Sequence, residues 1–184
     1  QQRDLERVRH SQQHLLGLIN DLLYYSRIEA GAVQYDMRDV AVTTLVDDVV
    51  TLVGPQAAAL GIELLLDPPS APVMVRADVG KTEQVLINLL TNALKHSEPG
   101  SKVTIRWSGD VATAAIQVID HGTGIPADKL EAIFEPFVQV GRTFTSSHEG
   151  TGLGLAISRD LARAMGGDIT VESALGEGSR LTVR

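Results

Sequence analysis

The chain has 184 residues, of which 43% are hydrophobic and 21% charged, so it can bury one core of ordinary size without disulfides or structural metals. Its 16 basic and 23 acidic residues give a net charge of −7, which argues against binding nucleic acid or an anionic membrane by charge alone. The chain lacks cysteine, which excludes disulfide bonds and cysteine-ligated zinc.

Residues 1–31 are expected to form one long helix that ends at Gly31. Its main apolar positions alternate between spacings of three and four residues, which is typical of a bundle seam with one polar member: Leu5, Val8, Gln12, Leu15, Ile19 and Leu22. A lone helix cannot bury such a seam. The helix therefore packs either on the rest of this chain or, as we favour, against a second helix or a second subunit.

Residues 32–41 are expected to be a linker, and residues 42–184 a separate domain. We expect helices over 42–60, 79–96, 127–133 and 153–165. We expect strands over 62–66, 73–76, 102–107, 114–119, 169–173 and 179–183. Because several strands are joined as hairpins by glycine turns, we predict a two-layer α+β sandwich with helices on one face of a mixed sheet, rather than a doubly wound fold.

The helix predicted over 79–96 carries a polar stripe beside its apolar face. The polar stripe consists of Gln84, Asn88, Asn92 and Lys95. Asparagine lowers helix stability because its amide competes for the backbone, so two asparagines one turn apart suggest a function. Amide oxygens suit Mg²⁺ when phosphates supply further ligands, and Lys95 could neutralise phosphate charge. The alternative is that both asparagines face water or bond to a neighbouring loop.

A predicted strand leads through Asp120 into a glycine-rich turn that contains Gly122, Gly124 and Ile125. The carboxylate could accept a hydrogen bond from an exocyclic amino group such as that of adenine. Glycine lets the backbone approach a flat ring closely and adopt positive φ. The alternative is an ordinary turn between a strand and a helix.

Glycines at 150, 152 and 154 lead a polar, aperiodic stretch over 138–152 into the last predicted helix. Free amide groups and the positive end of a helix dipole attract phosphates at such a position. No Gly-Lys-Ser or Gly-Lys-Thr follows, so the stretch is not a P-loop. It is long enough to close as a lid, and the alternative is a flexible linker.

Four stretches, taken in their order along the chain, resemble the catalytic ATP-binding domain of sensor histidine kinases. They are similar to its N box (Asn88 to Lys95), first glycine box (Asp120 to Ile125), F box (Ile133 to Phe137) and second glycine box (Gly150 to Leu155). Gly176-x-Gly178-Ser179 is similar to the last glycine motif. The likeness covers roughly residues 40–184, and it implies the two-layer α+β sandwich of the histidine-kinase and gyrase ATPases.

The helix over 1–31 resembles the second helix of the family's dimerisation and phosphotransfer hairpin. The box that holds the family's phosphoacceptor histidine has no counterpart in this sequence, and His10 and His14 have the flanking residues of the other helix. We therefore expect neither histidine to accept phosphate. We also expect a cytoplasmic piece of a longer protein, and that parent protein could be anchored in a membrane.

The resemblance implies a role for each matching residue. Asn92 would ligate Mg²⁺ with help from Asn88, and Lys95 would contact the phosphates, so Asn88 and Lys95 are the expected catalytic residues. Asp120 would bind the adenine amino group, and the loop over 138–152 would be a lid that packs on Phe134 and Phe137. Further residues expected to line the nucleotide are His96, Gly122, Gly124, Ile125, Gly150, Thr151, Gly152, Leu153, Gly154, Leu155 and Ser179.

The implied reaction moves the γ-phosphoryl group of ATP to a histidine on a phosphotransfer helix outside this chain. A response regulator receiver domain would take the phosphoryl group next, and the parent protein would be a homodimer that binds no nucleic acid. One alternative is a module that binds ATP only for regulation. Another is an ATPase of the gyrase or heat-shock chaperone kind, which uses an acidic N-box residue to activate water, whereas Asn88 is no general base.

Overall fold

The computed structural model describes residues 33–110, 113–139 and 151–184, and within the first 32 residues only positions 12, 15–17, 19, 22–23 and 26. Those separate positions are helical, and the rest of the helix predicted over 1–31 lies outside the described residues. Their large apolar side chains are all exposed: Leu15, Leu16, Ile19, Leu22 and Leu23.

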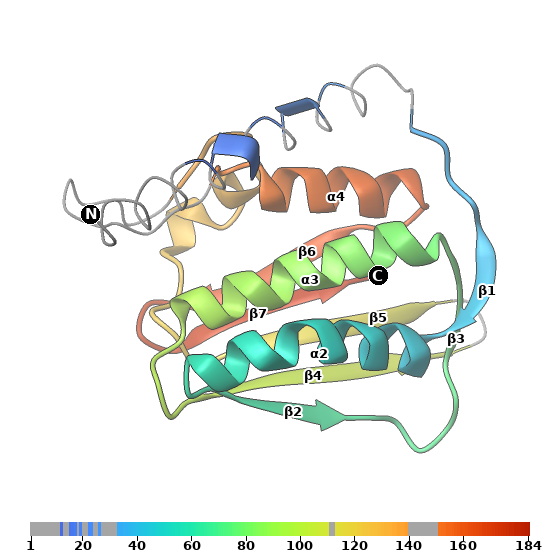
Figure 1. Ribbon diagram of the computed structural model, residues 1–184, viewed down its shortest axis with the longest axis horizontal. Coiled ribbons are helices and arrows are strands. Elements are labelled where there is room, and N and C mark those ends of the chain that lie inside the picture. The colour runs from blue at the N-terminus through green and yellow to red at the C-terminus, as the bar shows by residue number, and fades with distance from the viewer. Residues whose placement is uncertain are drawn as a thin grey trace.

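A five-stranded mixed sheet forms one layer of the fold (Figure 1). In spatial order its strands are β2 (Glu63–Asp67), β4 (Lys102–Gly109), β5 (Ala114–Asp120), β7 (Gly178–Val183) and β6 (Ile169–Ala174). β2 and β4 are parallel, and the other neighbouring strands are antiparallel. In β4, buried Val103, Ile105 and Trp107 alternate with more exposed residues, which is the pattern of a strand with one face on the core.

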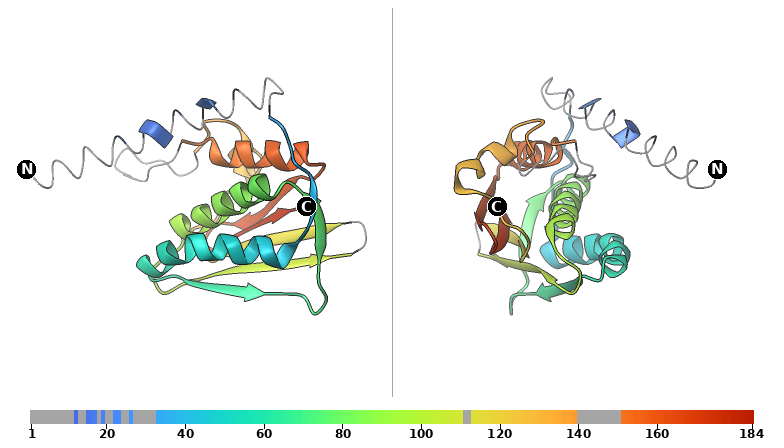
Figure 2. Two further views of the ribbon diagram at one scale, coloured as in Figure 1. Left: turned by 45° about the vertical axis from the view of Figure 1, so that its right-hand side comes forward. Right: turned by 90° about the vertical axis from the view of Figure 1, so that its left-hand side faces the viewer.

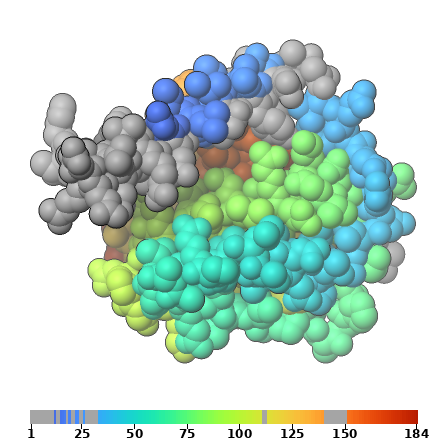
Figure 3. Space-filling model, in the orientation of Figure 1, coloured from blue at the N-terminus to red at the C-terminus, as the bar shows by residue number. Residues whose placement is uncertain are grey.

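Three helices form the second layer and lie on one face of this sheet (Figures 1 and 2): α2 (Val42–Ala59), α3 (Val79–His96) and α4 (Gly154–Ala164). In the space-filling view α2 and α3 run side by side across the molecule (Figure 3). The predicted α+β sandwich is therefore confirmed. Within the described ranges, no helix is both long enough and apolar enough to cross a membrane.

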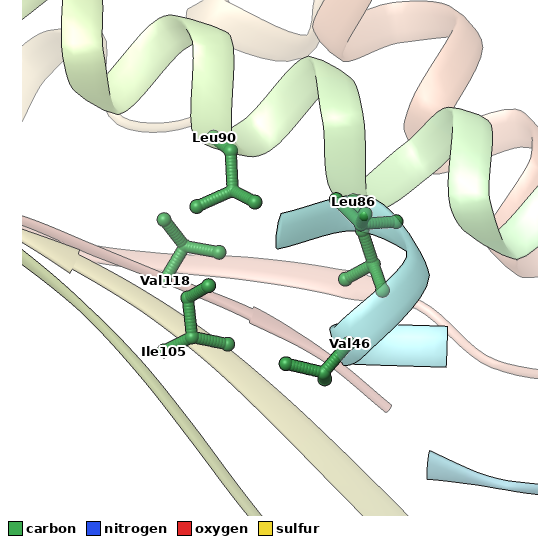
Figure 4. A pocket seen from close by; sticks show the side chains of 6 residues that line it. Val46, Leu86, Leu90, Ile105 and Val118 are labelled. Carbon is green, nitrogen blue, oxygen red and sulfur yellow. The ribbon is translucent and has the colours of Figure 1, made fainter. Parts of the chain in front are cut away.

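The hydrophobic core fills the space between the helices and the sheet. Figure 4 shows Val46 of α2, Leu86 and Leu90 of α3, Ile105 of β4 and Val118 of β5, which face one another there. All of these side chains are apolar and almost fully buried, so the space is packed core and not a ligand site. Their contacts also fix the rotation of α3 about its own axis.

Asp78 holds the first turn of α3 in place. One carboxylate oxygen accepts a hydrogen bond from the Lys81 N–H at 3.0 Å, which makes Asp78 the N-cap. The other oxygen accepts from the Asp36 N–H at 2.8 Å. A single side chain thus joins the segment ahead of the domain to the helix that carries the polar stripe.

Part of the predicted linker is a strand. Arg38–Ala41 form β1, which pairs in antiparallel register with β3 (Met74–Ala77) as a separate two-stranded sheet. Four residues are too few to show a strand period, and this strand exists only because β3 supplies its hydrogen-bond partners.

The prediction of one short helix over 127–133 is wrong. The chain makes two separate 3₁₀ turns instead, η1 (Ala127–Lys129) and η2 (Ala132–Phe134). Pro126 precedes the first turn and Pro136 follows the second, so the available segment is shorter than a stable α-helix requires. The second turn still buries Ile133 and Phe134 against the domain.

The rotation of α3 can be tested with a pair of leucines. Leu89 is 0% exposed, whereas Leu52 on the outer face of α2 is 63% exposed. We expect Leu89→Ala to lower the free energy of unfolding by about 2–5 kcal/mol, because it leaves a cavity in the core. Leu52→Ala should change it by less than about 0.5 kcal/mol. Urea unfolding measures both, and equal losses would contradict the described packing.

Candidate functional site

The helix that carries the polar stripe, α3, meets α4 at Asn88 and meets the turn that follows β5 at its last residue, His96. Asn88, Asn92 and Lys95 are half-buried, and His96 at the end of the helix is exposed. A Cβ at Gly122 would collide with the carbonyl oxygen of His96. The first glycine box therefore lies directly against the end of the helix that carries the N box, and only glycine permits this approach.

Asp120 is the buried polar group of the turn. It is 4% exposed, and its carboxylate accepts a hydrogen bond from the Gly122 N–H at 2.9 Å. Burial raises the pKa of Asp120, and hydrogen bonds from the backbone N–H groups of Gly122 and Ser179 oppose that rise. The site thus presents a desolvated carboxyl group next to a turn in which Gly122 and Gly124 leave the backbone uncovered by side chains.

The β6–β7 hairpin closes one side of this turn. A Cβ at Gly124 or at Gly178 would collide with backbone of the neighbouring segment, and both residues have positive φ. The Ser173 hydroxyl accepts a hydrogen bond from the Ile125 N–H at 2.8 Å and donates one to the Gly178 carbonyl at 2.6 Å. The last glycine motif therefore lies next to the first. Ser173 has no signal in the sequence, because only the fold brings it to Ile125.

Asn88 connects the polar stripe to α4. Its amide nitrogen donates to the Ser158 hydroxyl at 2.9 Å, and its oxygen lies so close to Gly154 that a Cβ there would collide with it. No hydrogen bond of the Asn92 amide is present within the described ranges. The two asparagines therefore differ: the nitrogen of the Asn88 amide is bonded within the fold and its oxygen is not, whereas neither end of the Asn92 amide is bonded to a described residue.

The F box meets the second glycine box ahead of α4. The Phe137 N–H donates to the Gly152 carbonyl at 2.9 Å, and both residues have positive φ. The Leu153 N–H donates to the Thr151 hydroxyl at 3.0 Å. The side chain of Leu153 is buried in the core, so only its backbone could face a nucleotide. Phe137 is exposed, and the predicted site residue Gly150 lies outside the described residues, as does most of the predicted lid.

Arg159 ties α4 to the F-box region and to the start of β6. Its guanidinium donates to Glu131 and to Asp168, each at 2.9 Å, and lies 4.4 Å from the centre of the Phe134 ring. Partial burial disfavours the ionised form of Asp168. Hydrogen bonds from Arg159, Arg163 and the Ile169 N–H outweigh that effect and lower the pKa of Asp168 to about 2.

The side chains at the polar stripe fit a magnesium ion only in company with phosphates. In the described part of the chain, no three His, Cys, Asp or Glu side chains are grouped so that they could hold a metal ion. The stripe offers neutral amide oxygens from Asn88 and Asn92, which are hard ligands. Such a set suits Mg²⁺ when the phosphates of a bound nucleotide supply the negative charge.

Residues 77–184 match the family described as histidine kinase-, DNA gyrase B-, and HSP90-like ATPases. The chain is 36% identical over 181 residues to the circadian input-output histidine kinase CikA of Synechococcus elongatus, covering 97% of this chain and 24% of that protein. It is 37% identical over 173 residues to the sensor histidine kinase RcsC of Escherichia coli, covering 92% of this chain and 18% of that protein. The chain thus spans about a quarter or less of these two relatives.

Solved structures of histidine kinases share the fold. Full-length ShkA in complex with AMPPNP has a TM-score of 0.85 and 34% identity, and the match covers 100% of this chain and 38% of that chain. The nucleotide-free catalytic domain of the histidine kinase ThkA has a TM-score of 0.70 and 27% identity, covering 80% of this chain and 93% of that chain.

The ion pairs of Asp168 can be tested by acid unfolding. Because the folded-state pKa lies below the ordinary value of about 4, Asp168 stabilises the fold above that value, and the contribution disappears as the pH falls towards 2. We expect Asp168→Asn to lower the free energy of unfolding at pH 7 by roughly 1 kcal/mol or less, because water screens a side chain that is 39% exposed.

The difference in the free energy of unfolding between the unaltered chain and Asp168→Asn should shrink as the pH is lowered from about 4 to 2. Asp128→Asn is the control, because Asp128 is far more exposed and its only described ion pair is with Lys129 at 3.8 Å. Urea unfolding at each pH measures the difference. A difference in the free energy of unfolding that stays constant with pH would show that Asp168 does not act through its charge.

Proposed function

This chain belongs to the family of histidine kinase-, DNA gyrase B- and HSP90-like ATPases, and we propose that it holds one ATP molecule between β5, α3 and α4. One observation carries the proposal: the first glycine box touches the end of α3, and the start of α4 touches Asn88, although these stretches are far apart in sequence. The proposed base site on the turn after β5 and the proposed phosphate site at the start of α4 would thereby both adjoin the proposed metal site on α3.

At the base end, Asp120 would accept a hydrogen bond from the amino group of adenine. A carboxylate is an acceptor only, so it favours adenine over guanine, which carries an oxygen at the corresponding ring position. Gly122 and Gly124 would let the backbone approach the ring, and Ile125 is half-buried in the same turn. Ser173 and Ser179 would keep that turn in place from the β6–β7 hairpin.

At the phosphate end, the backbone amides at the start of α4 would bind phosphate oxygens with the positive end of the helix dipole. Lys95 would add a positive charge from α3. Asn92, with Asn88, would hold a magnesium ion together with those phosphates, and a bound Mg²⁺ would neutralise charge on the phosphate tail. Thr151, Gly152 and Leu153 would contribute backbone on the same side.

We assign the chain to protein-histidine phosphotransfer in a two-component system. A nitrogen of a neutral histidine imidazole attacks the γ-phosphorus, the new P–N bond forms, and the bond to the β–γ bridging oxygen breaks to leave ADP. This chain's residues would position the tail and neutralise its charge without a covalent intermediate. Water activation is disfavoured, because the Asn88 amide is bonded to Ser158 and has no basic atom to take a proton.

The proposed partners follow from the same assignment. The phosphoacceptor histidine would lie on a helix outside this chain, and a receiver domain of a response regulator would take the phosphoryl group. The exposed leucines and isoleucine among the described positions of the first helix fit a second helix or a second subunit, as in a homodimer.

Asp120→Asn tests the base assignment. We expect ATP affinity to fall about 10- to 100-fold, since the hydrogen bond to a charged acceptor is lost, and the preference for ATP over GTP to shrink. Isothermal titration with both nucleotides measures this. Asp47→Asn, which changes an exposed carboxylate on α2, is the control and should bind as the unaltered chain does. Unchanged ATP affinity in Asp120→Asn would exclude the assigned base site.

Phosphotransfer in trans separates a kinase from a regulatory ATP-binding module. The chain incubated with Mg·ATP alone should gain no acid-labile phosphate on His10 or His14, because neither is expected to be the acceptor. With an added helical hairpin that carries a phosphoacceptor histidine, phosphate should appear on the hairpin, and Asn92→Ala should reduce its rate at least about tenfold. ATP binding without any transfer to the hairpin would favour the regulatory module.

A further inference from the structure

A buried serine on α4 is hydrogen-bonded to the first asparagine of the polar stripe. The Asn88 amide nitrogen donates to the Ser158 hydroxyl at 2.9 Å, and Ser158 is 2% exposed. Ser158 lies about one turn after Gly154, on the side of α4 that packs against α3. None of the motifs in the family resemblance includes Ser158, and the proposed chemistry does not use it.

A serine hydroxyl can donate as well as accept, so this hydrogen bond holds the Asn88 amide in place, and the second neighbour of the amide selects which end faces which group. With the nitrogen at Ser158, the oxygen Oδ1 lies against Gly154, the first residue of α4. The positive end of the helix dipole favours an oxygen over an amino group at that position. The serine therefore holds the amide in place, and the helix end favours the orientation in which the Asn88 oxygen lies at the end of α4, where phosphates would bind.

We propose that Ser158 is a positioning residue for magnesium: it holds the Asn88 amide so that the oxygen, and not the nitrogen, is available at the phosphate end of the site. This inference rests on the proposed function. An amide nitrogen offers only hydrogens, whereas the oxygen is a hard metal ligand. Without the hydroxyl, rotation about the last side-chain bond of Asn88 would present the nitrogen for part of the time.

The test is the magnesium dependence of ATP binding by the whole 184-residue chain and by Ser158→Ala. ATP affinity is measured by isothermal titration in EDTA and at a series of Mg²⁺ concentrations. In Ser158→Ala, the Mg²⁺ concentration that gives half of the full gain in affinity should rise about fivefold, which corresponds to one hydrogen bond. Affinity in EDTA should change less than about twofold, because the base and phosphate contacts remain.

Thr82→Val is a matched control for a purely structural effect. Thr82 is buried as Ser158 is, but it lies on α3. Its hydroxyl donates to the Asp78 carbonyl at 2.8 Å and lies 3.8 Å from the Met165 sulfur. Removal of the Thr82 hydroxyl should lower the melting temperature. It should leave the magnesium midpoint, the Mg²⁺ concentration that gives half of the full gain in ATP affinity, unchanged. Ser158→Thr, which keeps a hydroxyl, should restore the midpoint of the unaltered chain.

An Asn88→Ala background shows whether Ser158 acts through Asn88. There, adding Ser158→Ala should shift the midpoint no further. A normal midpoint in Ser158→Ala, or an equal shift with and without Asn88, would overturn the inference. If the unaltered chain itself showed no magnesium-dependent ATP binding, the proposed function would fail instead, so the two failures are distinguishable.

Discussion

The site depends on how α3 is rotated about its own axis. Burial of Leu86, Leu89 and Leu90 against the sheet fixes that rotation, because these side chains are almost completely removed from water. Successive residues of a helix are turned by about 100°, so Asn88 and Asn92 must lie at the edge of the core. The burial that holds the two layers together therefore also keeps both amides out of the core, and it places the Asn88 amide against α4.

Close backbone contacts complete the arrangement, and they explain why the motifs contain glycine. A Cβ at Gly122 would meet the last carbonyl of α3, one at Gly154 would meet the Asn88 amide, and one at Gly178 would meet the Asp120 carbonyl. Gly178 also has a φ of 85°, which a side chain would strain. The glycines therefore serve contacts between chain segments, so the shape of the site is set by the fold itself.

Sequence patterns predicted the elements whose signals are local. α3 begins and ends as expected, because Asp78 caps a long amphipathic stripe. β1 lies within the expected linker and is not predicted as a strand, because its four residues form a strand only beside β3. Ser158 and Ser173 gave no signal either, because their hydrogen bonds to Asn88 and Ile125 span 70 and 48 residues of sequence. Motifs predict which residues would bear chemistry, and only the tertiary contacts show which further residues hold them in place.

The carboxyl group of Asp120, which we propose binds the base, lowers the stability of the free domain when it is ionised. Burial raises the pKa of Asp120, and the N–H groups of Gly122 and Ser179 offset this only in part. A raised folded-state pKa means that ionisation of Asp120 lowers stability, so the free domain loses stability as the pH rises through that pKa. An asparagine of nearly the same shape would avoid this desolvation. A ligand amino group that donates to the carboxylate would replace part of the lost hydration, which argues that Asp120 serves a ligand and not the fold.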